Sequence, residues 1–293
     1  TAREYCEQAL TIFQATGNRA GATQTLNNLG LISTTLGDLE TARTYGEQAL
    51  KIFREVGDRK NEGFALSNLG ITYLESGDAP AALRAQQEVL EICREIDDRQ
   101  GEGVSQVNLA QVYHALDENA AARHACEQAL SIARAIGDRQ SEIYALNYLG
   151  QACEGLHDLA AAAAAYQKTL QLRREAGQDA LTMDTLAGLA RVALAEGRAA
   201  PARDYVDEIL AWITANGIEG VEEPLRVYLT CYDVLRATGT DAATTARAES
   251  VLTTMHGLLQ ERAARIGDPV RRRQYLDGIA AHRGIQAAWA ARA

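Results

Sequence analysis

Asparagine side chains suited to binding a peptide backbone recur along the chain at a fixed spacing. Asn28, Asn68 and Asn108 are each separated by 40 residues. A carboxamide offers both a hydrogen-bond donor and an acceptor, so it can pair with the N–H and C=O of a peptide unit whatever the sequence of that peptide. This spacing indicates a repeated row of carboxamide side chains, provided that the fold places them on one surface.

The sequence contains no recognisable set of catalytic residues. It has no Walker-type phosphate loop, no nucleophile elbow and no His-Glu-x-x-His segment. The five histidines are dispersed, and His114 and His124 lie ten residues apart with no third metal ligand nearby. We therefore expect a protein that is not an enzyme and that holds no metal and no cofactor.

The asparagines belong to a longer pattern with a period of 40 residues. The pattern recurs as Asn28-Leu29-Gly30, Asn68-Leu69-Gly70, Asn108-Leu109-Ala110 and Tyr148-Leu149-Gly150. A fixed period of this length is typical of helical repeats that stack into a solenoid, because no single unit can bury its own apolar face. Function in such a protein is expected on an extended surface.

Composition limits the classes of partner that the protein is expected to bind and the cellular compartment in which it is expected to work. The net charge is −10 and the isoelectric point is about 5.1, which argues against nucleic-acid binding because that rests on a basic surface. No run of 18 apolar residues and no signal peptide pattern occur, so no membrane association is expected. The five cysteines have no short spacing and fit buried thiols in a reducing, cytoplasmic compartment.

Residues 58–97 show the local signals of one unit. Gly57 suits the left-handed residue that ends a helix, and Asp58 can cap the next one, predicted from Arg59 to Ser76. Gly77-Asp78 repeats this signal before a second helix, predicted from Pro80 to Ile96. Each unit is thus a helix–turn–helix.

The unit resembles the tetratricopeptide repeat. Leu69-Gly70, Tyr73, Gly77-Asp78, Ala82 and Leu90 fall at that family's relative spacings, although the period is 40 residues rather than 34. The longer form is typical of kinesin light chains, cell-polarity adaptors and the C-terminal regions of bacterial signalling ATPases. The resemblance implies an all-α fold: a right-handed α-solenoid of antiparallel helix pairs with a C-terminal capping helix pair.

The period divides the chain into three regions. Residues 1–217 form the repeat array, with a half repeat at 1–17 and full repeats at 18–57, 58–97, 98–137, 138–177 and 178–217. Residues 218–267 form a divergent hairpin that is ten residues longer, which would lengthen both helices if shared equally. Residues 268–293 form the cap.

The first residues match only the second helix of a repeat. Ala9-Leu10 and Gly17 align with Ala49-Leu50 and Gly57, so an apolar stripe is expected to lack its partner helix. Two explanations stay open: the chain is a piece of a longer protein, or a second copy covers the stripe. The chain is accordingly expected to be a monomer or a weak homodimer through this half repeat.

The resemblance implies that the first helix of each pair lines a concave groove. Asparagines at the position of Asn28, Asn68 and Asn108 bind the backbone of an extended peptide in many members of the family. The alternative is that these side chains bond only the neighbouring helix. The predicted partner-binding residues are Asn27, Asn28, Phe64, Asn68, Asn108, Gln111, Tyr144, Asn147, Tyr148 and Gln151.

Charged pairs recur on the same helices. Arg59 and Glu62 lie three residues apart, as do Arg99 and Glu102, and Arg139 and Glu142. Such pairs are expected to be solvated and to contribute a few tenths of a kcal/mol each. The alternative is that they recognise an acidic partner.

The C-terminal segment carries a second resemblance. Gly267-Asp268-Pro269, Tyr275-Leu276, His282-Arg283-Gly284-Ile285 and Ala288-Trp289 resemble the end of repeat arrays in bacterial multidomain regulators of the STAND/NB-ARC class. This implies a non-catalytic scaffold that acts as the sensor arm of a larger signalling protein and binds a protein, an extended peptide or the upstream domains of the same polypeptide. The alternatives are a free-standing peptide-binding adaptor, a peptide-pheromone receptor and, from another class, an enzyme regulator or cryptic hydrolase.

Overall fold

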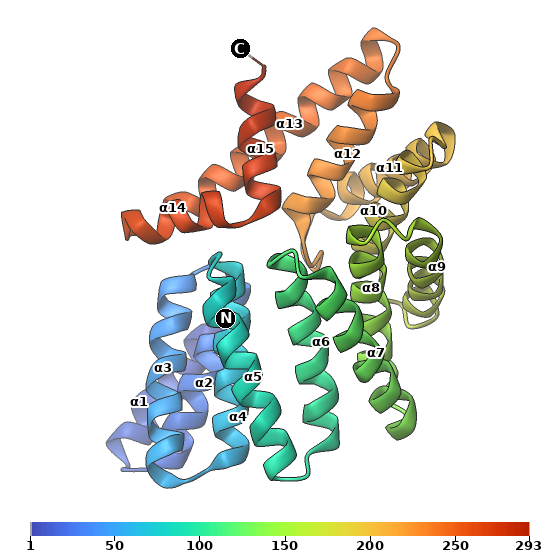
Figure 1. Cartoon of the computed structure of the whole chain (residues 1–293). Helices are drawn as coiled ribbons and strands as arrows, with labels where there is room; N and C mark the ends of the chain where they lie inside the picture. The colour runs from blue at the N-terminus through green and yellow to red at the C-terminus, as the bar shows by residue number, and fades with distance from the viewer. Residues whose placement is uncertain (1, 293) are drawn as a thin grey trace.

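The structure is a computed structural model that describes residues 2–292, and these residues form α-helices joined by short turns, without strands (Figure 1). The helices are α1 (Ala2–Ala15), α2 (Arg19–Thr35), α3 (Leu39–Val56), α4 (Arg59–Glu75), α5 (Ala79–Glu95), α6 (Arg99–Ala115), α7 (Asn119–Ile136), α8 (Arg139–Gly155), α9 (Leu159–Glu175), α10 (Asp179–Ala195), α11 (Ala199–Asn216), α12 (Pro224–Thr238), α13 (Ala242–Ala264), α14 (Pro269–Gly278) and α15 (Ala280–Ala290).

Successive helices pack side by side into an array, and the expectation of an all-α solenoid is confirmed. From α2 to α10, each even-numbered helix contacts the next even-numbered helix, whereas the odd-numbered helices scarcely contact one another. The even-numbered helices therefore lie on the inner, concave side of the curve. The helices at 59–75 and 79–95 end within one residue of the predicted positions.

The turns follow the cap chemistry that the sequence predicts. An aspartate carboxylate accepts a backbone N–H in the first turn of six helices of the array; these residues are Asp38, Asp58, Asp78, Asp98, Asp138 and Asp158. Glycines such as Gly57 adopt a left-handed backbone, with φ of 72°. Asp97, Asp117 and His157 take the same conformation where the repeat departs from glycine.

Small residues let the helices approach closely. Ala42, Ala82, Ala122, Ala162 and Ala202 recur every 40 residues and are at most 1% exposed. Leu29, Leu69 and Leu109 recur in the even-numbered helices and are at most 2% exposed. Because the same small and large residues return in each repeat, one packing arrangement propagates along the array.

Two of the three recurring Arg–Glu pairs form around a carboxylate that is not fully solvated, contrary to the sequence-based expectation, whereas Glu142 pairs with Arg134 and Arg139 pairs with Glu175. The Glu62 side chain is only 4% exposed and accepts hydrogen bonds from Arg59 at 2.7 Å and from Arg54 of the preceding helix at 2.9 Å. Glu102 joins Arg99 and Arg94 in the same way. These carboxylates tie successive repeats together, so their neighbours within the chain account for them without an acidic partner.

The extra residues of the sixth hairpin are not shared equally between its helices. Helix α12 has 15 residues, fewer than the 17 of α10, whereas α13 has 23. Residues 217–223, which we call the α11–α12 linker, take up the rest of the insertion. The condition of equal sharing is therefore not met, and the periodicity could not tell, because it does not distinguish a longer helix from a longer connection.

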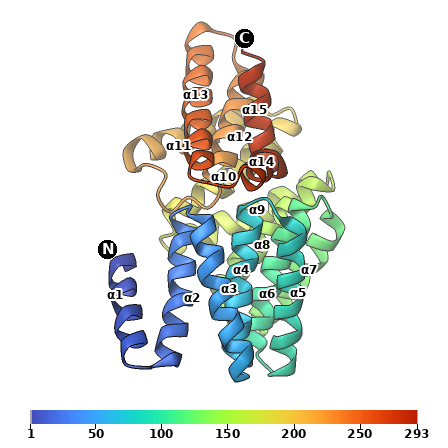
Figure 2. The same cartoon turned by 90° about the vertical axis from the view of Figure 1, so that its left-hand side faces the viewer.

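The C-terminal helices fold back onto one edge of the array (Figures 1 and 2). Arg265 donates to the carbonyl of Leu36, and the backbone N–H of Asp268 donates to Glu40. Leu39 joins the apolar core of α10–α15. The turn after α2 therefore contacts the segment that leads into α14. The turn after α4 contacts α14 itself, at Gly77.

The tightest of these contacts is between two glycines. Gly77 has φ of +84°, and a Cβ atom there would lie 2.7 Å from the carbonyl oxygen of Gln274. A Cβ atom on Gly278 would lie 2.9 Å from the carbonyl oxygen of Gly77. The turn after α4 and helix α14 thus meet backbone to backbone, without room for a methyl group.

We expect Gly77→Ala to separate α14 from this turn. Gly37→Ala is the matched control, because Gly37 has φ of +74° in the equivalent turn and a methyl group there would meet nothing within 4 Å. Both variants bear the left-handed backbone penalty of about 1–2 kcal/mol, and only Gly77→Ala adds the clash. Thermal melting and small-angle scattering should show a lower melting temperature and a larger radius of gyration for Gly77→Ala. Equal values for the two variants would contradict the contact.

Candidate partner-binding surface

The predicted partner-binding residues lie on α2, α4, α6 and α8, at positions that repeat along the inner helices. Gln24, Phe64, Val104, Tyr144 and Asp184 occupy one repeated position, and Leu31, Ile71, Gln111, Gln151 and Arg191 occupy another. The structure divides this surface into two parts. The part on α2, α4 and α6 is open, and the part on α8 and α10 is covered by the chain itself.

The open part exposes one large apolar side chain from each helix. Leu31, Phe64 and Val104 are 45%, 48% and 39% exposed. Asn28 beside them is exposed, while Asn68, Asn108 and Gln111 are partly buried. We call Leu31, Phe64 and Val104 the apolar row.

The amides of the asparagine row bond to neighbouring helices. Asn68 donates to the side-chain oxygen of Asn27 at 3.1 Å. Asn108 donates to the Ser67 hydroxyl at 3.2 Å and to Gln86 at 3.4 Å. Bonds of this kind are what the alternative hypothesis predicts, namely that the asparagines bond to the neighbouring helix. They engage the N–H groups of both amides, so peptide binding by this row stays a prediction that rests on the amide oxygens.

The covered part holds the remaining predicted residues. Asn147, Tyr148 and Gln151 are at most 4% exposed. The Tyr148 hydroxyl donates to Glu222, and the Gln151 amide donates to Glu223 at 3.4 Å. Asn147 accepts a bond from Thr185 of α10. Tyr148 and Gln151 therefore face the α11–α12 linker, which descends toward α6 and α8 (Figure 1).

The linker lies on α10 in the manner of a bound peptide. The two oxygens of Asp184 accept the backbone N–H groups of Glu222 at 3.0 Å and Glu223 at 2.9 Å. Val221 is 8% exposed and packs into the apolar core of α10–α15. Main-chain hydrogen bonds and one buried side chain fix this segment, and Pro224 then begins α12.

Arg173 lies behind the linker and is incompletely paired. Its side chain is fully buried, and one terminal nitrogen donates to Thr185 and to the carbonyl of Leu181. Its Nη2 lies 3.6 Å from Oε2 of Glu222, too far for a hydrogen bond. Within residues 2–292, Nε and Nη2 of Arg173 and Oε2 of Glu222 have no hydrogen-bond partner. The Arg173 guanidinium also lies 5.8 Å from the centre of the Tyr144 ring.

Further arginines connect the linker to the inner helices. Arg191 forms two hydrogen bonds with Glu154, at 2.6 and 3.0 Å, and a third with Thr230 of α12. Arg226 pairs with Glu223 at 2.9 Å. We call Arg173, Arg191, Arg226, Asp184, Glu154, Glu222 and Glu223 the charged cluster.

His114 extends the charged cluster onto α6. Arg226 approaches its Nε2 at 3.3 Å, and Nδ1 lies 2.9 Å from the amide oxygen of Asn119. A guanidinium can only donate, so Nε2 accepts and Nδ1 carries the proton. Burial and the positive charge of Arg226 lower the pKa of His114, consistent with this neutral tautomer. The imidazole is therefore a fixed connector between α12 and the turn after α6.

Burial and mutual repulsion raise the pKa of two carboxyl groups of the charged cluster, whereas Arg226 lowers the pKa of a third. Burial raises the pKa of Asp184 to about 6, and burial together with the charge of Asp184 raises the pKa of Glu222 to about 7. Burial also acts on Glu223, but Arg226 outweighs it and lowers the pKa of that carboxyl. Two carboxyl groups thus resist ionisation where the linker meets α10.

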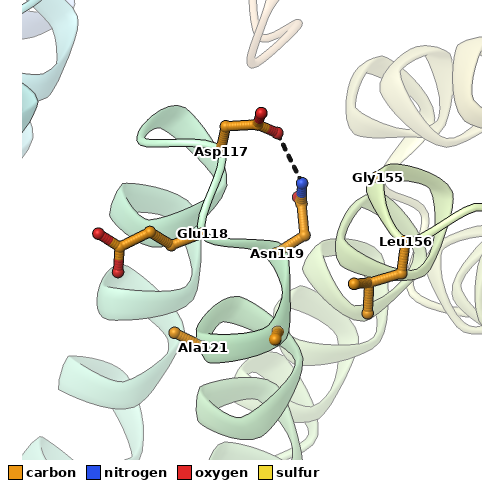
Figure 3. A pocket seen from close by; sticks show the side chains of 7 residues that line it. Asp117, Glu118, Asn119, Ala121, Gly155 and Leu156 are labelled. Carbon is orange, nitrogen blue, oxygen red and sulfur yellow. Dashed lines mark hydrogen bonds between the residues drawn. The ribbon is translucent and has the colours of Figure 1, made fainter.

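A shallow, open pocket lies beside this region, between the turns after α6 and α8 (Figure 3). Its walls include Asp117, Glu118, Asn119, Gly155 and Leu156, and the Asn119 amide donates to Asp117 at 2.8 Å. The Asn119 amide and the Asp117 carboxylate of the pocket wall thus bond to one another. In residues 2–292 no group of three or more His, Cys, Asp or Glu side chains is arranged to hold a metal ion.

Two further findings concern the burial of the cysteines and the length of the apolar helices. Cys93, Cys126, Cys153 and Cys231 are buried and free, as predicted, whereas Cys6 is partly exposed. None of the helices between residues 2 and 292 is long and apolar enough to cross a membrane.

The sequence-based reasoning missed the charged cluster, although a signal for it was present. Asp184 and Arg191 stand at repeated inner positions that carry uncharged residues in the preceding repeats. A charge of each sign in such positions indicates a different environment for the fifth repeat. The partners from the linker, Glu222 and Glu223, lie outside the repeat and had no position to be compared with.

The raised pKa values predict a pH dependence of stability. The folded state holds protons on Asp184 and Glu222 more tightly than the unfolded state, so this contribution is fully present below about pH 4 and is lost as the pH rises to about 7. We expect the difference in melting temperature between the wild type and Glu222→Gln to shift against the wild type as the pH rises from 5 to 8, because this comparison isolates Glu222 from the buried histidines, whose lowered pKa values act in the opposite direction. Glu219→Gln, on the exposed part of the linker, should retain the wild-type dependence. Identical curves for wild type and Glu222→Gln would show that Glu222 is not the source.

Solved structures with the same fold include proteins of several kinds. A Signal Transduction ATPase with Numerous Domains (STAND) protein with a tetratricopeptide repeat sensor, from Pyrococcus horikoshii, matches with a TM-score of 0.60 and 16% identity over 83% of this chain and 37% of that one. This chain thus spans little more than a third of the STAND protein. A Rap protein complexed with Competence and Sporulation Factor matches with a TM-score of 0.64 and 14% identity over 93% of this chain and 81% of that one.

The apo form of RapI matches with a TM-score of 0.67 and 12% identity, over 89% of this chain and 100% of that one. At these identities the likeness is one of fold. No curated protein sequence matches the chain significantly. The family model described as "Tetratricopeptide repeat" matches residues 1–55, 22–95 and 101–175, which together make up more than half of the chain. The chain therefore belongs to the tetratricopeptide repeat family.

Proposed function

We propose that the chain is a non-catalytic scaffold that binds an extended segment of a partner protein along α2, α4 and α6. The observation that carries this proposal is the apolar row: three neighbouring inner helices each expose one large apolar side chain at a concave face. Burying such side chains is worth about 25 cal/mol per Å² of apolar surface removed from water. The flanking amides of Asn28, Asn68 and Asn108 supply acceptors for a ligand backbone.

The spacing of the helices suggests the form of the ligand. Packed helices lie about 8–10 Å apart, so Phe64 and Val104, which share one repeated position, offer two contacts separated by one step of that size, while Leu31 stands seven residues beyond the equivalent position of its helix. A polyproline II segment advances about 3.1 Å per residue and returns to the same side every third residue, about 9 Å further on. The best-fitting ligand therefore carries apolar side chains at every third position. It needs little charge, because Leu31, Phe64, Val104 and their amide neighbours are uncharged.

The larger setting that we propose is the C-terminal sensor arm of a bacterial signalling protein. The likeness to the repeat sensor of the STAND protein supports it, together with the C-terminal segment that resembles the end of such arrays. The gene sequence upstream of Thr1 tests this setting, since an ATPase motif there would support it. A coding region without one would favour the free-standing adaptor.

A peptide-pheromone receptor is the second candidate. The structure of a Rap protein complexed with Competence and Sporulation Factor covers 93% of this chain. This candidate and the scaffold differ in ligand origin, because a receptor binds a short free peptide and a scaffold binds a segment of a larger protein. Comparing affinity for a selected peptide free and fused to a folded carrier distinguishes them.

Selection from a displayed library of random linear peptides tests the apolar row. We expect enrichment of sequences with apolar residues at every third position, and a loss of binding of at least about fivefold in Phe64→Ala/Val104→Ala, since each truncation removes roughly 1 kcal/mol of apolar contact. Ile136→Ala is the control, because Ile136 is 45% exposed at the end of α7, away from this face. Equal loss in the control, or none in the double variant, would contradict the proposal.

The asparagine row calls for a separate measurement. Asn68→Ala/Asn108→Ala removes both donors to neighbouring helices, so the melting temperature should fall. If the amides also bind the ligand backbone, affinity for the selected peptide falls as well, by about 1–3 kcal/mol. A purely structural role would lower the melting temperature and leave the dissociation constant unchanged.

A further inference from the structure

The covered part of the concave face has the chemistry of a peptide-binding site with its occupant in place. Glu222 and Glu223 place their backbone N–H groups on Asp184, and their carboxylates contact Tyr148, Gln151 and Arg226. The contacting side chains of α8 and α10 stand at repeated inner positions, those that in α2, α4 and α6 form the open surface. The linker therefore occupies the continuation of the surface to which we assign partner binding.

We infer that the concave face of α8 and α10 is a binding site for an acidic, extended segment of a partner protein, and that the α11–α12 linker occupies this site until the partner arrives. The inference goes beyond the proposed function, which concerns α2, α4 and α6. It specifies acidic side chains for this second part, and a mode of control by competition within the chain.

The incomplete pairing of Arg173 is the reason to expect displacement. Arg173 is fully buried, yet within residues 2–292 its Nε and Nη2 lack hydrogen-bond partners, while Oε2 of Glu222 stops 3.6 Å short of Nη2. Unpaired buried polar groups are costly, and a guanidinium accepts a carboxylate through two parallel bonds when the geometry allows. A ligand carboxylate that reaches Arg173 directly would satisfy donors that the linker leaves unpaired.

Arg226 and Arg173 supply positive charge for an acidic occupant, against which the charge of Asp184 acts at Glu222. Three arginines lie around the linker: Arg173 of α9, Arg191 of α10 and Arg226 of α12. Of these, Arg191 is the one that forms hydrogen bonds with Glu154. Removing Glu222 and Glu223 would leave Arg226 without its carboxylate partner and would take away the carboxylate that lies 3.6 Å from Nη2 of Arg173, while Asp184 would remain near Arg173. Because Tyr148 also donates to Glu222, the site presents donors for at least two ligand carboxylates.

The first half of the linker is held less firmly than Val221, Glu222 and Glu223. Gly217 and Gly220 have φ of +79° and +83°, and Ile218 and Glu219 between them are partly or fully exposed. A tethered segment competes at an effective concentration in the millimolar range, so a free ligand of equal contacts binds poorly until it outcompetes the tether. The tether thus sets a threshold for binding.

Fluorescence anisotropy with a labelled peptide of the sequence Ile-Glu-Gly-Val-Glu-Glu-Pro, blocked at both ends, tests the inference on the full chain. We expect Glu222→Ala/Glu223→Ala to bind this peptide at least tenfold more tightly than the wild type, because the tethered competitor is weakened. Glu219→Ala, on the exposed part of the linker, is the control and should bind as weakly as the wild type. A peptide with Gln in place of the adjacent glutamates should bind at least tenfold more weakly to the double variant.

Two further variants locate the bound peptide. Tyr148→Phe in the background of the double variant removes only the hydroxyl that donates to Glu222, and should weaken peptide binding about fivefold. Phe64→Ala/Val104→Ala in the same background should leave it unchanged. A failure of the apolar row and a failure of this site are therefore distinguishable.

Hydrogen exchange of the wild type covers the case in which the double variant does not fold. Millimolar peptide should accelerate exchange of the Glu222 and Glu223 amides, which the linker otherwise binds to Asp184. Unchanged exchange overturns the inference, as does a folded double variant that binds no better than wild type or binds both peptides equally. A doubled mass by light scattering on removal of the glutamates would also overturn it, because the occupant would then be a second copy of the chain.

Discussion

Every feature of this protein depends on the contact between the inner helices of successive repeats. A single helix pair leaves one side open, and only the next pair can cover it: Leu69 of α4 packs at Gly46 of the preceding outer helix. The alanines that return every 40 residues on the outer helices keep the two helices of each pair close, and the Glu62 and Glu102 carboxylates join each of their inner helices to the preceding outer helix through arginines. Because the inner helices contact one another and the outer ones scarcely do, the array must curve, and the curve creates the concave face.

Much of this arrangement could be predicted from the sequence because it is local and repeated. Gly57 and Asp58 mark a helix end and a cap by their own conformational preferences, and the period transfers that information to every other repeat. The solenoid and the inner positions of Phe64, Asn68 and Gln111 follow. Long-range contacts carry no such signal: in the sequence Gly77 looks like any other turn glycine, yet in the structure it meets the backbone of α14.

At the partner-binding surface, the repeat register alone likewise fails to predict which side chains are buried. Tyr148 and Gln151 were expected to line an open groove because their register equals that of Asn68 and Ile71. Their burial depends on residues 217–223, a segment without a repeat position, and on an insertion whose location within the hairpin the periodicity does not fix. The charges of Asp184 and Arg191 mark the place where the inner surface changes character, and an interruption in a repeated surface is therefore the most useful pointer to specialised chemistry in such a chain.

The fold-back of α14 onto the turn after α4 gives the array a thermodynamic property that an open solenoid lacks. Small changes in the angle between neighbouring repeats add up along the chain, so the distance between early and late repeats is sensitive to all of them. In this protein an early turn and a late helix touch, at Gly77 and Gly278. Binding on the concave face and closure of this contact are then linked equilibria: a ligand that prefers one curvature shifts closure by the same factor by which closure shifts the affinity of that ligand.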